Sequence, residues 1–581
     1  MTLKLHKIAI AISAFASLVS LGATAATTSD AAADMVFYGG PVITVNEKSP
    51  QVTGLAVKNG NIIAVGNQAE ILQGYVGSNT QLINLQGRTL MPGFVEPHLH
   101  ISLTAMTENV ALNLSNFTLP YDSIDTILDK LRAQKAKVPE DAWIVGFGVD
   151  PSRTTPFMAE LTADQLDKVS TTNPIFIVNQ SGHIAYVNHK ALEVSGITEN
   201  TPNPGNGGVY ARDAQGKLTG VLIEPPSYAA FAKKMTPPSQ QIVVDAYMKT
   251  VKGMAASGIT TSSEMGMGAI MPYEVEYQMV QALSHQPDFP VRVRAYLWGA
   301  SLPEGFDAIK PNQGDDQFRV VGVKYIADGS TQGLTAALNK PYNYPKGTTN
   351  RGALDWENEK LYAASKQFFD QGWQISVHAN GDRAIDQTLD LHGRLLKDSK
   401  SPGSRRLRIE HFTVNNEKQV DKLQKLGVLP SLTIGHVGFW GEVFHDHILH
   451  EAQADRIDPT GTLAKRKIRF SFHSDSPVSP YYPLRYISTG SSRLWQAPPR
   501  KVLGPQQRIS VDQAIKAVTL DAAYAMFMED KVGSLEPGKW ADLVVLDQNP
   551  RTTDPVKIEQ IKVLETYVGG KRMFKSDENQ P

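Results

Sequence analysis

The stretch MPGFVEPHLH, residues 91–100, ends in two histidines that are separated by a single residue. Residues i and i+2 of a β-strand point to the same face, so a strand here would hold the imidazoles of His98 and His100 side by side. Paired imidazoles of this kind are a metal-ligand geometry. The rest of the chain therefore has to be searched for further ligands, and for a fold that brings them to this strand.

The middle of the chain repeats one theme, a short β-rich stretch that ends in a polar residue and is followed by a helical one. The segments 359–372 and 416–427 have clear helical periodicity. Strand and helix alternating eight times predict an α/β fold, a TIM-like (β/α)8 barrel with its chemistry at the C-terminal ends of the strands. The predicted strands are 91–100, 258–266, 291–299, 321–329, 373–381, 406–412, 428–436 and 468–476.

Two further units are predicted around this barrel, which would occupy residues 91–504. Residues 101–257 separate the first two predicted strands, whereas a whole βα unit needs roughly 30 residues. We therefore predict a large insertion after the first strand, covering the barrel mouth, and assign the strand-like stretches WIVGFGVD and PIFIVNQ to it. The ends of the chain, 33–90 and 505–575, alternate apolar and polar residues between turns, which predicts one small β-sandwich domain built from both.

Residues 1–25 have the pattern of a secretory signal peptide. Lys4 and Lys7 precede an apolar stretch too short to span a bilayer comfortably, and Ala23-Thr24-Ala25 supplies a small-x-small cleavage site. An uncleaved anchor is the alternative. We expect a soluble bacterial protein that is periplasmic or secreted, with no membrane attachment after signal cleavage.

Composition limits the partners and the ligands of this protein. The formal net charge of −1 gives no general attraction to nucleic acid or to an anionic membrane, and we expect no nucleic-acid partner. The expected partner is a small-molecule substrate. The sequence contains no cysteine, which excludes disulfides and leaves only nitrogen and oxygen ligands for a metal.

Polar residues at the predicted strand ends converge on one mouth if the barrel forms. His378 ends the fifth strand, His411 the sixth and Asp475 the eighth. Lys324 lies within the fourth strand, on the same face as Ile326 and Asp328.

These residues resemble the amidohydrolase superfamily, and closely its family 3, the YtcJ-like branch that includes N-substituted formamide deformylases. The resemblance covers nearly the whole chain after the signal. Departures from the family pattern are Glu96-Pro97 before the histidine pair, DGSTQG after the lysine strand, and residues 432–435 before His436, and they weaken any transfer of substrate specificity. The motifs that carry the resemblance are PGFVEPHLH, SGHIAYVNHKAL, GGVYARDAQGKLTGVLIE, GITTSSEMG, VKYIADGS, VHANGDRAID, RIEHF, SDSPV and GSLEPGKWADLVVLD.

The resemblance implies two divalent metal ions, usually zinc, although manganese or iron would also suit these ligands. One ion would be bound by His98, His100 and Asp475, and the second by His378 and His411. A carboxylated Lys324 would bridge them. The alternative for Lys324 is a salt bridge to Asp328, because some members of the superfamily use a single metal.

The function implied is hydrolysis of a non-peptide C–N bond, in an N-acyl or N-formyl amine or a cyclic amide, by attack of a metal-bound hydroxide. Asp475 would carry the proton from the hydroxide to the leaving nitrogen. His436 would stabilise the oxyanion or be structural, and His183 and Asp328 are candidate substrate ligands.

Alternatives to this function remain open at this stage. The same site could hydrolyse an ester or a lactone, or the chain could be a catalytically silent periplasmic binding or regulatory protein. A sugar-acting barrel would need paired carboxylates at the strand ends, where this chain has histidines. The histidines 445, 447 and 450 are interpreted as part of a solvated helix after the seventh strand. The resemblance to the family is also compatible with a homodimer.

Overall fold

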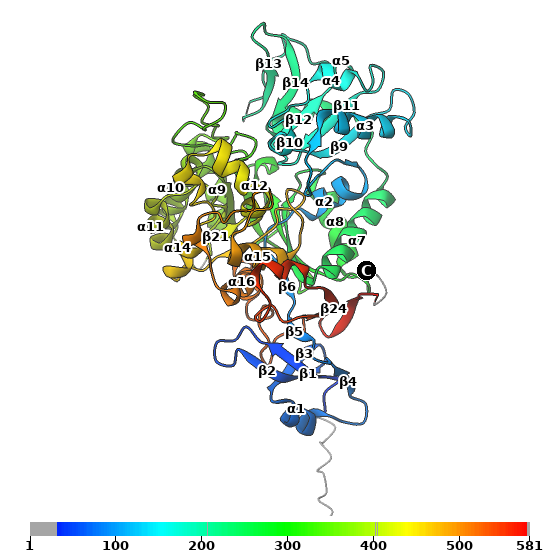
Figure 1. The fold of residues 1–581 in the computed structure, drawn as a ribbon, viewed down its shortest axis with the longest axis vertical. Coiled ribbons are helices and arrows are strands. Elements are labelled where there is room, and N and C mark those ends of the chain that lie inside the picture. The colour runs from blue at the N-terminus through cyan, green and yellow to red at the C-terminus, as the bar shows by residue number, and fades with distance from the viewer. Residues whose placement is uncertain (1–31, 206, 401–402, 404, 578–581) are drawn as a thin grey trace, which may run out of the picture.

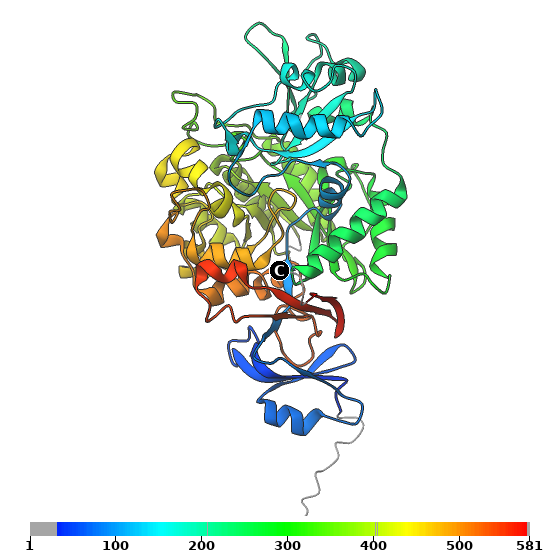
Figure 2. The same cartoon turned by 45° about the vertical axis from the view of Figure 1, so that its right-hand side comes forward.

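The computed structural model describes residues 32–205, 207–400, 403 and 405–577 (Figure 1). The predicted signal peptide, residues 1–25, lies outside the described residues. A barrel forms the centre of the molecule, with a sheet made from both chain ends below it and the insertion above it (Figures 1 and 2). None of the helices in these described parts is long and apolar enough to cross a membrane.

Eight parallel strands form the barrel, and each lies next to its neighbour in chain order. Two hydrogen bonds join the last strand to the first, just beyond the ends of both. The Asp475 N–H donates to the His98 carbonyl at 3.1 Å, and the His100 N–H donates to the Ser476 carbonyl at 2.9 Å. The predicted parallel barrel is thus confirmed as a nearly closed sheet. Its strands are β6 (Phe94–Glu96), β15 (Ile259–Met267), β16 (Arg292–Trp298), β18 (Phe318–Ile326), β19 (Gln374–Ala379), β20 (Arg408–His411), β21 (Leu429–Leu432) and β22 (Ser471–Phe472).

The first predicted strand is in fact two strands that belong to different sheets. Strand β5 (Thr89–Pro92) pairs in the terminal sheet, and β6 enters the barrel after Gly93. A Cβ on Gly93 would lie 2.3 Å from a side-chain carbon of Thr260, so only glycine fits this crossing. His98 and His100 consequently follow the strand instead of lying within it, and the prediction that strand alternation pairs them was wrong.

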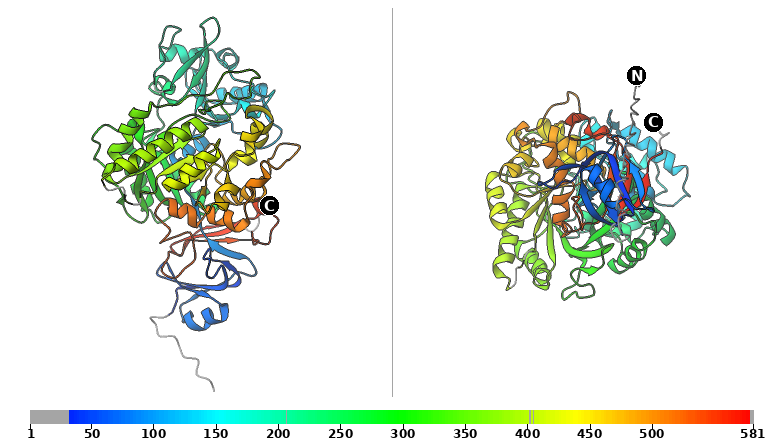
Figure 3. Two further views of the ribbon diagram at one scale, coloured as in Figure 1. Left: turned by 90° about the vertical axis from the view of Figure 1, so that its left-hand side faces the viewer. Right: turned by 90° about the horizontal axis from the view of Figure 1, so that it is seen from below.

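Helices surround the strands (Figure 3), and several begin and end where the sequence predicts. The side chains of Asn416 and Gln419 form a capping box at the start of α11, and Gly427 ends it in the left-handed conformation. The predicted helical segments 359–372 and 416–427 are confirmed by α9 and α11. The helices of this layer are α2 (Ile101–Asn109), α7 (Gln240–Ala256), α8 (Tyr273–Ser284), α9 (Asn358–Gln371), α10 (Asp382–Asp398), α11 (Glu417–Leu426), α12 (Gly435–Glu442), α13 (Glu451–Ala454), α14 (Thr460–Lys465), α15 (Pro483–Ser492), α16 (Val511–Ala517) and α17 (Leu520–Ala525).

The insertion contains a separate six-stranded sheet in the order β13-β14-β12-β11-β9-β7. The two stretches assigned to the insertion from sequence are β9 and β11 of this sheet. Both flanking helices within 101–257, α2 and α7, pack their apolar side chains into the barrel core, so the inserted sheet itself starts at β7. The strands and α-helices of the insertion between α2 and α7 are β7 (Leu112–Asn113), β8 (Asp122–Ser123), α3 (Ile124–Lys135), β9 (Ile144–Val149), β10 (Thr154–Thr155), α4 (Ala163–Asp167), β11 (Ile175–Asn179), β12 (Ile184–Val187), α5 (His189–Ser195), β13 (Val209–Arg212), β14 (Leu218–Ile223) and α6 (Ala229–Ala232).

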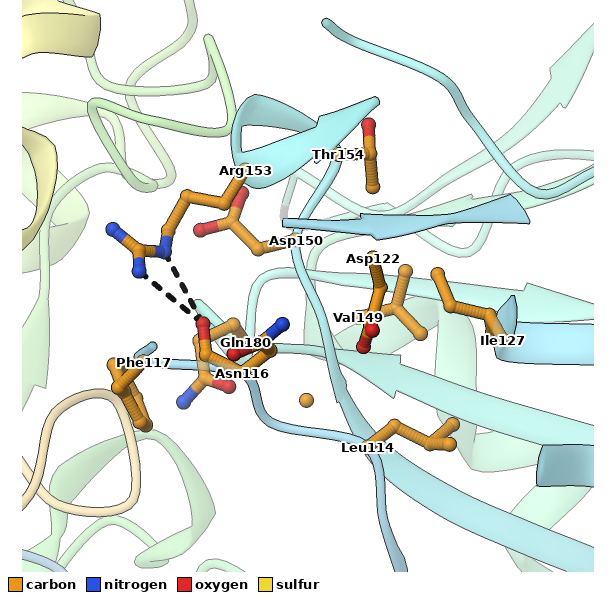
Figure 4. A pocket seen from close by; sticks show the side chains of 11 residues that line it. Leu114, Asn116, Phe117, Asp122, Ile127, Val149, Asp150, Arg153, Thr154 and Gln180 are labelled. Carbon is orange, nitrogen blue, oxygen red and sulfur yellow. Dashed lines mark hydrogen bonds between the residues drawn. The ribbon is translucent and has the colours of Figure 1, made fainter. Parts of the chain in front are cut away.

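Buried polar contacts fix the insertion to the barrel, and Figure 4 shows the insertion residues Asp150, Arg153 and Gln180 that make them. The Asp150 carboxylate accepts from the Trp440 indole N–H of α12 at 2.7 Å, and the Arg153 guanidinium donates to the Phe439 carbonyl of the same helix. Within the insertion the guanidinium also donates to the Asn116 carbonyl (Figure 4). The Gln180 amide donates to the carbonyls of Pro477 and Val478, at 2.6 and 3.0 Å. Because Pro477 and Val478 closely follow Asp475, the insertion supports the loop that carries this candidate ligand.

The terminal sheet takes five strands from the start of the chain and three from its end, in the order β25-β24-β23-β5-β1-β2-β3 with β4 beside β1. These strands form one continuous hydrogen-bonded sheet, where the sequence suggested a sandwich. The predicted C-terminal part began at residue 505, but α16 contributes to the barrel core and the strands of this sheet start at β23. Its elements are β1 (Met35–Ile43), β2 (Gln51–Lys58), β3 (Asn61–Gly66), α1 (Gln68–Tyr75), β4 (Gln81–Asn84), β5, β23 (Leu543–Leu546), β24 (Val563–Val568) and β25 (Lys571–Lys575).

Candidate metal centre

His98 lies at the centre of a group of polar side chains at the C-terminal end of the barrel. Its side chain is fully buried, and its Nε2 atom lies 3.2 Å from Oδ1 of Asp475 and 3.1 Å from Nζ of Lys324. The Nε2 atom of His100 lies 3.5 Å from the same Asp475 oxygen. The imidazoles of His98 and His100 therefore approach the same oxygen of Asp475, and these are the three residues predicted from sequence to bind one ion.

His378 and His411 stand beside this group, at the ends of β19 and β20. Their ring centroids are 4.3 Å apart, and the His411 centroid is 5.0 Å from that of His98. The Nδ1 atom of His411 lies 2.7 Å from the Thr433 hydroxyl, whereas its buried Nε2 atom has no hydrogen-bond partner. One nitrogen orients the ring and the other is left for a ligand.

The backbone turns sharply at two of these positions. His411 has a φ of 71° and Asp475 a φ of 58°, both in the left-handed region that residues other than glycine rarely adopt. Strain of this kind persists where the surrounding structure holds it, and it is concentrated at functional sites. At both positions it coincides with a candidate ligand.

The charges of this group depend strongly on one another. Burial by itself would raise the pKa of Asp475, but His411, His100 and His98 hold it well below its usual range. Burial lowers the pKa of Lys324 to about 8, although Glu410 and Asp475 oppose this shift. Lys324 therefore has an accessible neutral amine, the form that can react with carbon dioxide.

The structure adds two residues that the sequence analysis missed, Glu410 and His473. Oε2 of Glu410 lies 2.7 Å from Nδ1 of His98, and the His473 ring stacks on that of His98 with centroids 4.4 Å apart. Ligand atoms of His98, Glu410 and His473 all lie within 4.8 Å of one another. His473 precedes Asp475 by two residues, the same spacing as His98 and His100, and this signal could have identified it.

His183 extends from the insertion toward the group. Its Nδ1 atom lies 2.7 Å from Oε2 of Glu224, and its ring centroid is 5.1 Å from that of His378. Burial would lower the pKa of His183, but Glu224, Asp355 and Asp328 raise it to about 9. The residue is therefore a cationic hydrogen-bond donor beside the candidate ligands.

Asp328 has a different position from the one its sequence spacing suggested. Its fully buried carboxylate accepts the backbone N–H groups of Ala337, Asn380 and Gly381, at 2.8, 2.9 and 2.8 Å. The alternative of a salt bridge between Lys324 and Asp328 is not observed, because the two side chains have different partners. This carboxylate joins the loop after β18 to the end of β19.

His436 was predicted on the seventh strand, but it lies in α12 after β21 has ended. Its Nδ1 atom is 3.2 Å from the Thr413 hydroxyl, which donates to Asn380, and its ring packs against Trp440 and Phe444. Its side chain is almost completely buried among these groups.

The histidines after the seventh strand lie in a π-helical segment, Val443–Ile448, and in the residues that follow it. His445 pairs with Asp446, whereas His447 lies 3.1 Å from Glu442 and stacks on Phe157. Because the two imidazoles have separate partners, this motif does not act as one ligand group.

A cavity of about 500 Å³ opens above the candidate ligands, between the barrel and the insertion. His100, Lys324, His378 and Asp475 line it from the barrel, and His183 lines it from the insertion. A volume of this size is typical of sites that enclose a small organic molecule.

The residues present fit a divalent metal ion. Ligand atoms of His98, His411 and Asp475 lie within 4.8 Å of one another, and the buried Nε2 of His411 has no other partner. Imidazole nitrogens and one carboxylate are the ligands that zinc and related ions prefer in catalytic sites. The two groups of candidate ligands share His98, and both lie at the carboxyl ends of the barrel strands.

The fold and this site define a metal-dependent hydrolase of the barrel type, and comparison with known proteins identifies the family. The family model described as "Amidohydrolase family", Amidohydro_3, matches residues 81–574. The chain belongs to this family.

Individual relatives agree with this assignment. An N-substituted formamide deformylase from Arthrobacter pascens is 24% identical, over 92% of this chain and 97% of the relative. The protein YtcJ of Bacillus subtilis (strain 168) is 25% identical, over 93% of this chain and 99% of the relative. A crystal structure of an uncharacterized metal-dependent hydrolase from Pyrococcus horikoshii OT3 has the same fold, with a TM-score of 0.68 and 22% identity, and covers 90% of this chain and 99% of that one.

Proposed function

We propose that this protein is an exported metal-dependent hydrolase that cleaves a non-peptide C–N bond, in an N-acyl or N-formyl amine or a cyclic amide. The observation that carries the proposal is the meeting of His98, His411 and Asp475 within 4.8 Å, beneath a cavity that admits a small molecule. The deformylase relative supports this bond type, since its name describes removal of the formyl group from an N-substituted formamide.

Two divalent ions, with zinc as the favoured metal, are part of the proposal. His98, His100 and Asp475 would hold one, His378 and His411 the other, and Lys324 would bridge them as a carbamate. When bound, such ions lower the pKa of water and polarise a carbonyl group. The lowered pKa of Lys324 supports carboxylation at this position.

The residues of the chain would move the proton and orient the substrate. Asp475 would accept the proton of the attacking water and deliver it to the leaving nitrogen, since its carboxylate is ionised and faces the cavity. His183 is better placed than His436 to donate a hydrogen bond to the developing oxyanion, because its ring lines the cavity and its charge is stabilised by Glu224. We therefore assign the oxyanion role to His183.

Export is part of the proposal and rests on residues 1–25 alone. Expression of the full chain with periplasmic fractionation and N-terminal sequencing tests it, with cleavage near Ala25 as the expected result.

A substrate screen of metal-loaded protein tests the catalytic proposal. N-formyl amines, N-acyl amino acids, cyclic ureas and lactones would be supplied, and release of amine would be measured for the nitrogen substrates. Hydrolysis of at least one amide, lost in Asp475→Asn, is expected. Hydrolysis of lactones alone would overturn the assignment to C–N bonds.

A further inference from the structure

The cavity above the candidate ligands has a polar floor and apolar walls. Phe147, Phe176 and Val178 line it from the strands of the insertion, and Ile270, Trp298 and Ile326 line it from the barrel. Five of these side chains come from two separate sheets, and Ile270 lies in the loop that follows β15, so the cavity lies between the insertion and the barrel. An apolar group placed between these side chains would lose its contact with water, and this burial favours binding.

The same walls offer little to a charged group. Besides the candidate ligands and His183, the ionisable side chains among the described residues that line the cavity are Glu264 and Tyr228. Burial and the neighbouring Glu276 raise the pKa of Glu264 well above its usual range, which disfavours the charged form of its carboxyl group. No arginine is among these described lining residues. A charged substituent held between these apolar walls, away from the candidate ligands and His183, would lose its hydration with few polar partners to replace it.

The entrance of the cavity is also apolar. Ile270 is 42% exposed although it lines the cavity, and Ala229 and Ala232 lie exposed on α6, three residues apart on one face. Exposed apolar side chains at the rim of a cavity mark a binding surface for an apolar ligand.

We propose that the substrate is an uncharged amide with a bulky hydrophobic substituent, and that this substituent occupies the space between the insertion and the barrel. This proposal rests on the proposed hydrolase function and names its substrate class. In the reaction the C–N bond breaks, water supplies OH to the acyl carbon and a proton to the nitrogen, and a carboxylic acid and an amine are released. A cavity of about 500 Å³ leaves room for an alkyl chain or an aromatic ring.

A homologous series of N-formyl n-alkylamines, from ethyl to octyl, tests the proposal on the metal-loaded full chain. We expect kcat/KM to rise about fourfold for each added methylene until the cavity is full, because each buried methylene contributes about 0.8 kcal/mol. An analogue of the octyl compound that ends in a carboxylate should fall at least tenfold below it. Equal kcat/KM along the series, or an equally good charged analogue, would overturn the proposal.

A pair of variants locates the substituent. Ala232→Trp fills the apolar rim and should lower kcat/KM for the octyl compound about tenfold more than for the ethyl compound. Lys233→Trp, at the next exposed position outside the cavity lining, should leave both values within twofold of the unaltered protein. The same loss on both compounds in Ala232→Trp would contradict this placement.

Calorimetric binding of N-ethylurea and N-octylurea separates failure of this proposal from failure of the hydrolase function. Tighter binding of N-octylurea that Ala232→Trp removes, without cleavage of any formamide or of any other amide in the substrate screen, would sustain the hydrophobic site and reject the hydrolase function. Cleavage of formamides with equal binding of both ureas would sustain the hydrolase function and reject the hydrophobic site.

Discussion

Glu410 and Asp475 contact opposite nitrogens of one imidazole. Oε2 of Glu410 lies 2.7 Å from Nδ1 of His98, and Oδ1 of Asp475 lies 3.2 Å from its Nε2. A carboxylate at Nδ1 favours a proton on that nitrogen and leaves the Nε2 lone pair for a metal. The Arg408 guanidinium and the Ser376 hydroxyl bind Glu410 in turn, so the carboxylate itself is fixed.

Replacement of Glu410 by glutamine is expected to weaken metal binding about 10- to 100-fold, because the amide holds the His98 ring less firmly. Competition with a chelator and measurement of bound metal would show the change. Ser376→Ala removes only a hydrogen bond to the other Glu410 oxygen and serves as the matched control, with a smaller loss. Equal metal affinity in Glu410→Gln and the unaltered protein would contradict the role given to Glu410.

Asp475→Asn is expected to lower kcat at least about 100-fold on any amide that the protein cleaves, because the amide cannot carry a proton. Steady-state kinetics and metal content should be measured on the same sample. A variant that keeps its metal and its full rate would exclude Asp475 as the proton carrier.

Carbon dioxide should control the recovery of activity after metal removal. Apoprotein reloaded with zinc in bicarbonate-free buffer is expected to recover slowly, and added bicarbonate should accelerate recovery, because the buried Lys324 amine has its pKa lowered to about 8. Lys324→Arg, whose side chain stays charged, should gain nothing from bicarbonate. Recovery at the same rate with and without bicarbonate would refute carboxylation.

Stability should fall in acid partly because of His392 on α10. Burial lowers the pKa of this imidazole to about 3, from an ordinary value of 6.5, and neither ring nitrogen has a hydrogen-bond partner. Between these values the unfolded chain takes up a proton that the folded chain does not. The free energy of unfolding therefore decreases as the pH falls from about 6.5 toward 3, by up to about 1.4 kcal/mol per pH unit.

Replacement of His392 by leucine removes this contribution. Urea unfolding at pH 7.5 and pH 5 is expected to show a smaller loss of stability for His392→Leu than for the unaltered protein. Identical losses in the two proteins would show that His392 does not contribute.

The barrel was predictable because each strand is a short apolar run followed by a polar residue, and because parallel strands place those residues at one edge. His378 and His411 follow this rule, since His411 is the last residue of β20 and His378 the last but one of β19. His436 was not, because β21 stops at Leu432 and the chain turns into a helix before the histidine. Periodicity does not indicate where a strand of four residues stops.

Glu410 was missed for a related reason. It precedes His411 directly, and neighbouring strand residues normally face opposite ways, so only one of the two was expected at the site. The positive φ of His411 breaks this alternation and allows both residues to contact His98. A local backbone exception of this kind is decided by tertiary contacts and leaves no pattern in the sequence.

The pairing of β5 with β23 has a consequence for synthesis of the chain. Strand β5 can form its hydrogen bonds to β23 only after Leu543–Leu546 has left the ribosome. The edge of β5 that β23 will cover, just before Gly93 and the first barrel strand, therefore stays unpaired through most of translation. Closing so long a loop is entropically slow. Premature termination before residue 543 would therefore leave this edge unpaired and exposed to other nascent chains.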